Sequence, residues 1–156
     1  MTVRVVRTQS HFYKDKLPRQ EEYAGKGLGV YFMLFEITAG PDALYIPISI
    51  ATGRKSAGFL YVVEGTGVGT PTVALLGKGG KDVTTVSSGT IVYTKIPQGK
   101  TATFVVNAEV IGQVERSYRV LVSTISYKTN PNDLRYKKFQ VDIGTDTLLF
   151  KEMKRG

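Results

Sequence analysis

The string Gln98-Gly99-Lys100-Thr101 is the first candidate for chemistry, because it matches the end of a phosphate-binding P-loop. A P-loop needs another glycine five positions before Gly99 and must open into a helix, so that backbone amides surround the phosphate. Thr94 occupies that position, and the residues after Thr101 alternate as a strand does. We therefore do not expect a nucleotide site here.

The glycine-rich segment Gly65-Thr66-Gly67-Val68-Gly69 is a second candidate, for dinucleotide binding. Its glycines do not have the spacing of the dinucleotide fingerprint, and it leads toward Pro71 rather than into a helix. It predicts a flexible turn.

His11 is the only histidine and the chain has no cysteine. A site with several histidines is thereby excluded, and a zinc site without cysteine would need an unusual set of carboxylates. Serine hydrolysis would have to use His11, yet no Gly-x-Ser-x-Gly segment presents a nucleophile. We expect no cofactor and no metal ion.

Carboxylates that are distant in sequence can meet in space, and the nearest candidate pairs are Glu36 with Asp42 and Asp142 with Asp146. The second pair flanks Gly144, but no calcium-loop spacing surrounds it. We interpret all four as ordinary turn or surface carboxylates. With no catalytic residues singled out, we expect that the protein is not an enzyme.

Two clusters mix basic and aromatic residues: His11-Phe12-Tyr13-Lys14-Asp15-Lys16 and Arg135-Tyr136-Lys137-Lys138-Phe139. Exposed rings that stack on bases, beside cations that neutralise phosphates, are how single-stranded nucleic acid is bound. The alternative is that the rings pack inward while the cations protect strand edges from aggregation. We favour the alternative and do not expect a nucleic-acid partner.

These residues must be positioned by β-strands, because short runs rich in valine and threonine alternate with turn signals along the whole chain. We predict an all-β fold, a single antiparallel immunoglobulin-like β-sandwich, with a jelly roll or barrel as the second possibility. The expected strands are Thr2 to Gln9, Gly29 to Thr38, Leu44 to Ile50, Phe59 to Glu64, Thr72 to Leu76, Thr90 to Ile96, Thr101 to Ile111, Ser117 to Tyr127 and Lys138 to Phe150, the last broken at Gly144.

The segments Thr101 to Ile111 and Ser117 to Tyr127 alternate most regularly. Ala102, Phe104 and Val106 share a face of the first, with Ala108 and Val110; Tyr118, Val120 and Val122 share a face of the second. Because only a short turn around Gly112-Gln113 separates them, we predict that they form a hairpin.

The segment Gly29 to Thr38 is apolar on both faces through Phe35, which predicts a central strand that is covered on both sides. Residues 10–28 are charged, aromatic and interrupted at Leu17-Pro18, so we expect a long connection or arm there. Residues 1–156 are then one domain with that segment as its irregular part.

Composition fits a folded domain, with 42% hydrophobic and 22% charged residues. The longest apolar run, Val30 to Phe35, is too short to cross a bilayer. The net charge of +8 is concentrated toward the two ends, and we interpret it as a solvated surface. No signal peptide is visible after Met1.

The segments Phe35 to Pro47, Ile96 to Phe104 and Ser117 to Val120 resemble immunoglobulin-like domains in surface proteins of uncultivated small-genome bacteria. The similarity covers roughly residues 30–128. It implies a scaffold or adhesion role at the cell surface, and it places Tyr118 as the tyrosine of a tyrosine corner. Since the cysteine and tryptophan of antibody domains are absent, the core would consist of Phe32, Leu34, Phe104, Val106, Val120 and Val122.

We therefore expect a non-catalytic structural or surface module that builds an extracellular or particle-like assembly or acts in adhesion. The alternatives are a virion or phage structural protein and a glycan-binding module with exposed aromatic residues. The expected partner is a second copy, bound through strand-edge pairing or through exchange of the arm Thr2 to Gln9. The expected location is extracellular or at the cell surface, and otherwise the virion.

Overall fold

The computed structural model describes residues 1–49, 58–65, 70–79 and 83–151, whose regular secondary structure is strand apart from one short 3₁₀ turn, η1 (Glu21–Tyr23). The strands are β1 (Thr2–Tyr13), β2 (Lys26–Thr38), β3 (Leu44–Ser49), β4 (Phe59–Gly65), β5 (Thr70–Gly79), β6 (Thr84–Ser88), β7 (Ile91–Ile96), β8 (Thr101–Gln113), β9 (Ser117–Tyr127), β10 (Lys137–Gly144) and β11 (Leu148–Leu149).

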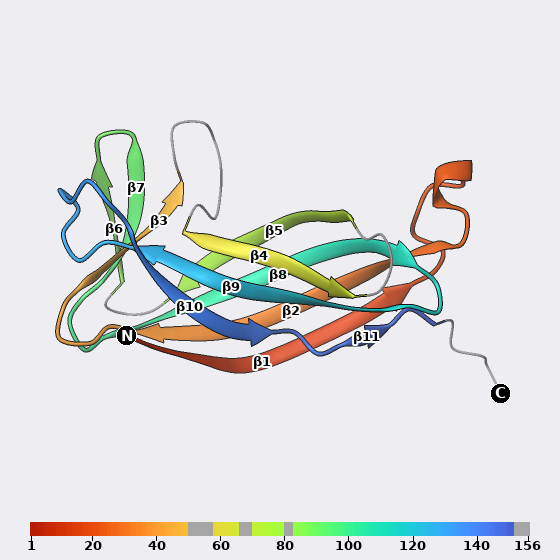
Figure 1. The fold of residues 1–156 in the computed structure, drawn as a ribbon, viewed down its shortest axis with the longest axis horizontal. Helices are drawn as coiled ribbons and strands as arrows, with labels where there is room; N and C mark the ends of the chain where they lie inside the picture. The colour runs from red at the N-terminus through yellow and green to blue at the C-terminus, as the bar shows by residue number, and fades with distance from the viewer. Residues whose placement is uncertain (50–57, 66–69, 80–82, 152–156) are drawn as a thin grey trace.

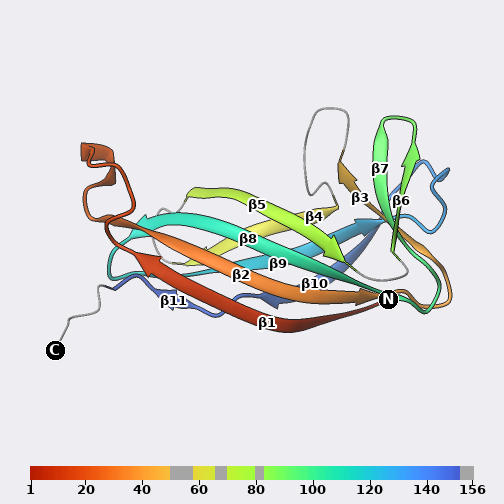
Figure 2. The ribbon, with the colours of Figure 1, turned by 180° about the vertical axis from the view of Figure 1, so that it is seen from behind.

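The strands form three antiparallel sheets. Sheet A has the order β1-β2-β8-β5; sheet C has β9 in its centre, with β4 on one side and β10 followed by β11 on the other. These two long sheets lie face to face, and the small sheet B (β3-β7-β6) stands at one end of them (Figures 1 and 2). The sheets do not close into a barrel, so the predicted all-β antiparallel sandwich is confirmed.

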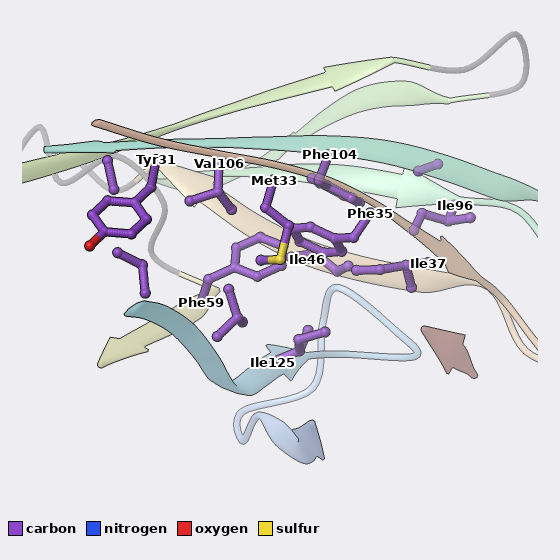
Figure 3. Close-up of a cluster of buried hydrophobic side chains, with 14 of the residues drawn as sticks. Tyr31, Met33, Phe35, Ile37, Ile46, Phe59, Ile96, Phe104, Val106 and Ile125 are labelled. Atoms are coloured by element: carbon purple, nitrogen blue, oxygen red, sulfur yellow. The ribbon is translucent and has the colours of Figure 1, made fainter. Parts of the chain in front are cut away.

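The core lies between sheets A and C and is built from alternate residues of β2, β8 and β9, because successive side chains of a strand point to opposite faces. Stacked and tilted rings of Phe35, Phe104 and Phe59 occupy its middle, with centroids 5.2 to 5.9 Å apart (Figure 3). The largest side chains with almost no exposure are Tyr31, Tyr93, Tyr118, Phe35, Phe104, Phe150, Met33, Ile37, Ile46, Ile96, Ile125 and Val106.

One end of the core is closed by Phe150. Its ring packs against Tyr118, with centroids 4.7 Å apart, and against Phe12 at 4.9 Å. Gly29 and Gly112 lie under these rings, and a Cβ at either position would collide with Phe150. Glycine is therefore required inside two otherwise regular strands, because the rings occupy the space of the missing side chains.

The strand predictions agree with the structure at most positions, including the break after Gly144. The strand β6 (Thr84–Ser88) was not predicted, since its five residues are polar apart from Val86. Ile50 and residues 66–69, which were assigned to a strand end and to a glycine-rich turn, lie outside the described residues.

The predicted hairpin of Thr101 to Ile111 with Ser117 to Tyr127 is wrong, although both strands and their buried faces are correct. β8 pairs with β2 and β5 in sheet A, whereas β9 pairs with β4, β10 and β11 in sheet C. The short connection, in which Glu115 has a φ of 69°, carries the chain from one sheet to the other. The buried faces of the two strands therefore face each other across the core.

β2 is central in its sheet, as predicted, but it is fully covered on one face only. Tyr31, Met33, Phe35 and Ile37 have no exposed surface, while the residues between them are only half-buried. Phe32 and Leu34, which we expected in the core, point to the outer face of sheet A. Four consecutive apolar residues from Phe32 to Phe35 contain no alternation that would distinguish the two faces.

The connection between the first two strands is shorter than the predicted 10–28. β1 continues to Tyr13 and β2 begins at Lys26, so only residues 14–25 lie between them. Residues 10–13 are held as strand because each has a partner on β2, from Ser10 opposite Tyr31 to Tyr13 opposite Leu28. The segment Thr2 to Gln9 likewise pairs with β2 of its own chain.

Candidate functional site

The residues that suggested nucleotide or histidine chemistry lie in unrelated places. Pro97 to Lys100 form a turn in which Gly99 has a φ of 69°, and Thr101 begins strand β8 rather than a helix. His11 lies exposed on β1 with its ring centroid 4.4 Å from that of Tyr13. Residues 97–101 therefore do not form a P-loop, and His11 lies on a different strand from Thr101.

The two candidate carboxylate pairs do not form, because the members of each pair have different neighbours. Glu36 accepts a hydrogen bond from Arg4 at 2.8 Å, whereas Asp42 is exposed in the turn before β3. Asp142 lies 3.8 Å from Arg119, and Asp146 accepts a hydrogen bond from Thr8 at 2.9 Å. Within the described ranges, no three histidine or carboxylate side chains gather as ligands for a metal ion.

The second basic-aromatic cluster lies near a buried cation. Lys128 follows β9 and is only 7% exposed, and its ammonium group lies 4.6 Å from the ring centroid of Tyr136 and 5.6 Å from that of Tyr93. Backbone hydrogen bonds between Lys128 and Tyr45 join this segment to sheet B. The outer face of sheet B continues the arrangement, because Lys95 lies 5.7 Å from the ring centroid of Tyr45.

The hydroxyl groups of Tyr93 and Tyr136 are 3.3 Å apart. Burial, and then this hydrogen bond, raises the pKa of Tyr136 far above its ordinary value, so the phenol stays neutral. Two neutral rings around one ammonium group are a favourable cation–π arrangement. The geometry supports a structural role for these rings, which are already engaged with Lys128 and with each other.

The first basic-aromatic cluster is divided between the two faces of β1. Phe12 points inward and stacks on Phe150, whereas His11 and Tyr13 are on the outer face. Tyr13 is 37% exposed, and the ammonium group of Lys16 lies 5.7 Å from the centroid of its ring.

The feature that stands out is the outer apolar face, by which we mean the apolar outward side chains of β2 and β8 in sheet A. On β8 the polar residues Asn107 and Glu109 lie between them. No described strand covers this side of the sheet, which is turned toward the viewer in Figure 2. Its half-buried members are Leu28, Val30, Phe32, Leu34, Val105 and Ile111. Antiparallel sheets with one solvated face normally carry polar residues there, so this face is an exception.

The outer apolar face has a polar border with charges of both signs. In the register of the sheet, Arg7 lies beside Leu34, and the guanidinium group of Arg7 is 5.4 Å from the ring centroid of Phe32. Across the same sheet, Glu109 of β8 lies beside Val30. An apolar centre with a polar rim is the usual composition of a protein–protein interface.

The outer face of sheet C is different. Leu60 and Val62 are exposed on its edge strand β4, at 55% and 43%, but its central strand carries Arg119. Arg119 lies 3.7 Å from Glu64 and 3.8 Å from Asp142, so charged groups cross the middle of this face. The apolar residues of sheet C therefore lie at an edge, whereas those of sheet A occupy the centre.

Sequence reasoning missed the outer apolar face because it assigned Phe32 and Leu34 to the core. The signal that would have found it is the run Val30 to Phe35 itself, since an antiparallel strand with apolar residues on both faces requires a cover for each. In the described residues, sheet C covers the inner face of sheet A, and no strand covers the outer face.

Comparison of the chain with models of protein families, with curated proteins and with solved structures finds no match. In the described part of the chain, no helix is long and apolar enough to cross a membrane.

Proposed function

We propose that the protein is a non-catalytic structural module that assembles by packing the outer apolar face of sheet A against a second copy of the chain. The observation that carries this proposal is the row Leu28, Val30, Phe32 and Leu34 on the central strand β2, directed away from the core. Each of these side chains would lose water contact on association, and apolar burial is the main favourable term in most protein–protein association.

A second copy is the occupant that the charges favour. Arg4 is already paired with Glu36 of β2. The rim then carries Arg7 on β1 and Glu109 on β8, so a basic and an acidic group lie on opposite sides of the apolar row. Arg7 and Glu109 lie two residues from the level of Phe32 in opposite directions along the strands. A two-fold axis through Phe32, in the plane of the sheet and oblique to the strands, would therefore place Arg7 of one copy over Glu109 of the other. Such a face is complementary to itself, whereas a rim of one sign would repel its own copy.

We assign the module to the immunoglobulin-like domains of bacterial surface proteins, and its expected location is the cell exterior. Tyr118 supports this assignment: it is buried, and its hydroxyl accepts a hydrogen bond from the backbone amide of Gln113 at 3.1 Å. A tyrosine near the start of a strand that bonds to backbone a few residues upstream is the arrangement of the tyrosine corner.

The test is the mass in solution, measured by light scattering and sedimentation velocity over a range of concentrations. The wild-type chain is expected to dimerise, and Phe32→Lys to raise the dissociation constant about 100-fold, because it places an ammonium group in the apolar centre. Val30→Thr, which conserves side-chain shape, is expected to weaken the dimer while leaving the monomer folded. Circular dichroism verifies the fold of each variant.

The matched control is Leu60→Lys, the same kind of change at an exposed apolar residue of sheet C. It is expected to leave the dimer unchanged. A wild-type chain that stays monomeric at every concentration would overturn the proposal, as would a dimer that Leu60→Lys dissociates and Phe32→Lys does not.

A further inference from the structure

The connection between β1 and β2 forms a pocket at the end of the sandwich opposite sheet B, where the coil with η1 projects from the sheets (Figures 1 and 2). The tip pocket, as we name it, has a volume of about 330 Å³, within the range of small-molecule sites. All its walls come from residues 14–26. The residues that bear on its chemistry are Lys14, Asp15, Arg19, Gln20, Tyr23 and Lys26.

Backbone hydrogen bonds hold the pocket in shape. The amides of Gln20, Tyr23 and Ala24 donate to carbonyls two or three residues earlier, at 2.9 to 3.1 Å. At its base, the amide of Val114 donates to the carbonyl of Gly25 at 2.9 Å, which fixes the connection to the end of sheet A. A pocket with an ordered backbone loses less entropy when a ligand binds.

The charges of the tip pocket favour an anion. Three cations, Lys14, Arg19 and Lys26, face one carboxylate, Asp15. Among the ion pairs of the described residues, none involves Arg19 or Lys26. Guanidinium and ammonium groups form strong charge-assisted hydrogen bonds with carboxylate, sulfate or phosphate oxygens.

Other groups of the pocket favour a ligand with hydroxyls. Asp15 accepts hydrogen bonds only, and the Gln20 amide both donates and accepts, which suits the hydroxyls of a sugar. The half-buried ring of Tyr23 adds an apolar surface for its C–H groups. A second hollow of about 340 Å³ adjoins the pocket and shares Lys14 and Asp15 with it, so two neighbouring sugar units would find places.

A nucleic acid fits these features less well. Single strands bind through successive free rings along a basic groove, but here Phe12 is stacked on Phe150 and the Tyr13 ring contacts His11 and Lys16. Asp15 lines both hollows, and the backbone sugars of a DNA strand offer no free hydroxyl for it to accept from. The mixture of cations, a hydroxyl acceptor and a ring matches an acidic sugar better.

We propose that the tip pocket binds an acidic sugar unit of an anionic polysaccharide, with Arg19 and Lys26 on its anionic group and Asp15 on its hydroxyls. This site is at the end of the molecule and does not depend on the assembly through the outer apolar face. A dimer that binds no ligand would contradict only the proposal for the tip pocket. A monomer that binds the ligand would contradict only the proposal of assembly.

The experiment is calorimetric titration of the full chain at low salt with four probes: trigalacturonate, a heparin tetrasaccharide, maltotriose and a ten-residue oligothymidylate. We expect binding of trigalacturonate or the heparin tetrasaccharide, and the stronger of the two identifies carboxylate or sulfate as the anion. Arg19→Ala is expected to weaken that binding about tenfold, the effect of losing one charge-assisted hydrogen bond.

The matched control is Lys138→Ala, which removes the same charge from exposed β10, outside both hollows. It is expected to retain the affinity within about twofold, because a distant charge contributes only a screened term. Four results would overturn the proposal: no binding of either acidic probe, equal binding of maltotriose, tighter binding of the oligothymidylate, or equal losses in Arg19→Ala and Lys138→Ala.

Discussion

Tyr31 shows how one residue combines packing with a specific hydrogen bond. Its ring has no exposed surface, and its hydroxyl donates to the backbone carbonyl of Tyr118 at 2.8 Å, which ties β2 in one sheet to β9 in the other. Burial, and secondarily the nearby Tyr118, raises the pKa of Tyr31 far above its ordinary value. The folded chain therefore keeps this phenol protonated at alkaline pH.

The stability of the protein is expected to fall as the pH rises above about 10, where tyrosine in the unfolded chain ionises. Because the folded-state pKa of Tyr31 is raised, its contribution to the free energy of unfolding is complete below pH 10. Above pH 10 this contribution decreases by about 1.4 kcal/mol per pH unit, until the pH reaches the folded-state pKa. Tyr31→Phe is expected to cost about 1–3 kcal/mol at pH 8, since it removes the buried hydrogen bond to the Tyr118 carbonyl.

Urea denaturation of both proteins between pH 8 and 12 is the measurement. The free energy of unfolding of Tyr31→Phe should fall less steeply above pH 10 than that of wild type. Val106→Ala is the control, because it weakens the core without removing a phenol, and its curve should run parallel to wild type. Parallel curves for Tyr31→Phe and wild type would contradict the argument.

Lys128 is expected to stabilise the contact between sheet B and the segment after β9. Replacement by methionine keeps the aliphatic packing but removes the ammonium group from the rings of Tyr93 and Tyr136, at a cost of about 1 kcal/mol. A double-mutant cycle of Lys128→Met with Tyr136→Leu, followed by urea denaturation, should give a coupling energy of at least about 0.5 kcal/mol. Additive effects would show that the cation and the ring do not interact.

At the scale of the elements, the sequence located β8 and β9 but not their partners. An inward row of Phe104, Val106 and Val110 is equally suited to a hairpin partner beside it or to a strand facing it across the core. β2 and β9 compete to pair with β8. β2 forms a ladder along the whole of β8, from Lys26 opposite Gln113 to Thr38 opposite Thr101, which β9 with its shorter length cannot exceed.

This topology can be tested with cysteine pairs, because the chain has no cysteine of its own. Leu34→Cys with Val105→Cys is expected to form a disulfide, since these residues are direct partners on β2 and β8. Val105→Cys with Ser123→Cys would be opposite one another in a hairpin of the predicted strands, but in the structure they lie in different sheets. Mass spectrometry after mild oxidation should find the first disulfide as an intramolecular bond and not the second.

At the scale of the molecule, the sandwich and sheet B differ in how much core they contain. Buried side chains of β2, β8 and β9 fill the interior of the two-sheet sandwich, whereas β6 at the free edge of sheet B has no buried residue. Sheet B reaches the core through Leu44, Ile46 and Ile96. Its stability therefore depends on contacts made by β3 and β7.

Hydrogen exchange is expected to follow this difference. The amides of β2 and β8 should exchange only through global unfolding, whereas those of β6 should exchange orders of magnitude faster through local opening. Mass spectrometry of peptides from each strand at several times measures the two rates. Equal protection of β6 and β2 would mean that the whole chain unfolds as one unit.

The sequence by itself determined the secondary structure and much of the core, because alternation and turn residues act locally. Phe104, Val106, Val120 and Val122 were placed correctly for this reason, and Asn130 to Asp133 form the turn that their composition predicts. Only the tertiary structure decided which strands pair and which face of β2 is buried. Pairing is a competition among distant segments, and a strand that is apolar on both sides gives no local signal of its orientation.

The same division holds for the candidate sites. The basic-aromatic clusters were visible as sequence, but only packing sent Phe12 inward and surrounded Lys128 with rings. The tip pocket and the outer apolar face depend on how β1 and β2 are aligned and on what covers sheet A. Those features are set by contacts between segments that no local pattern describes.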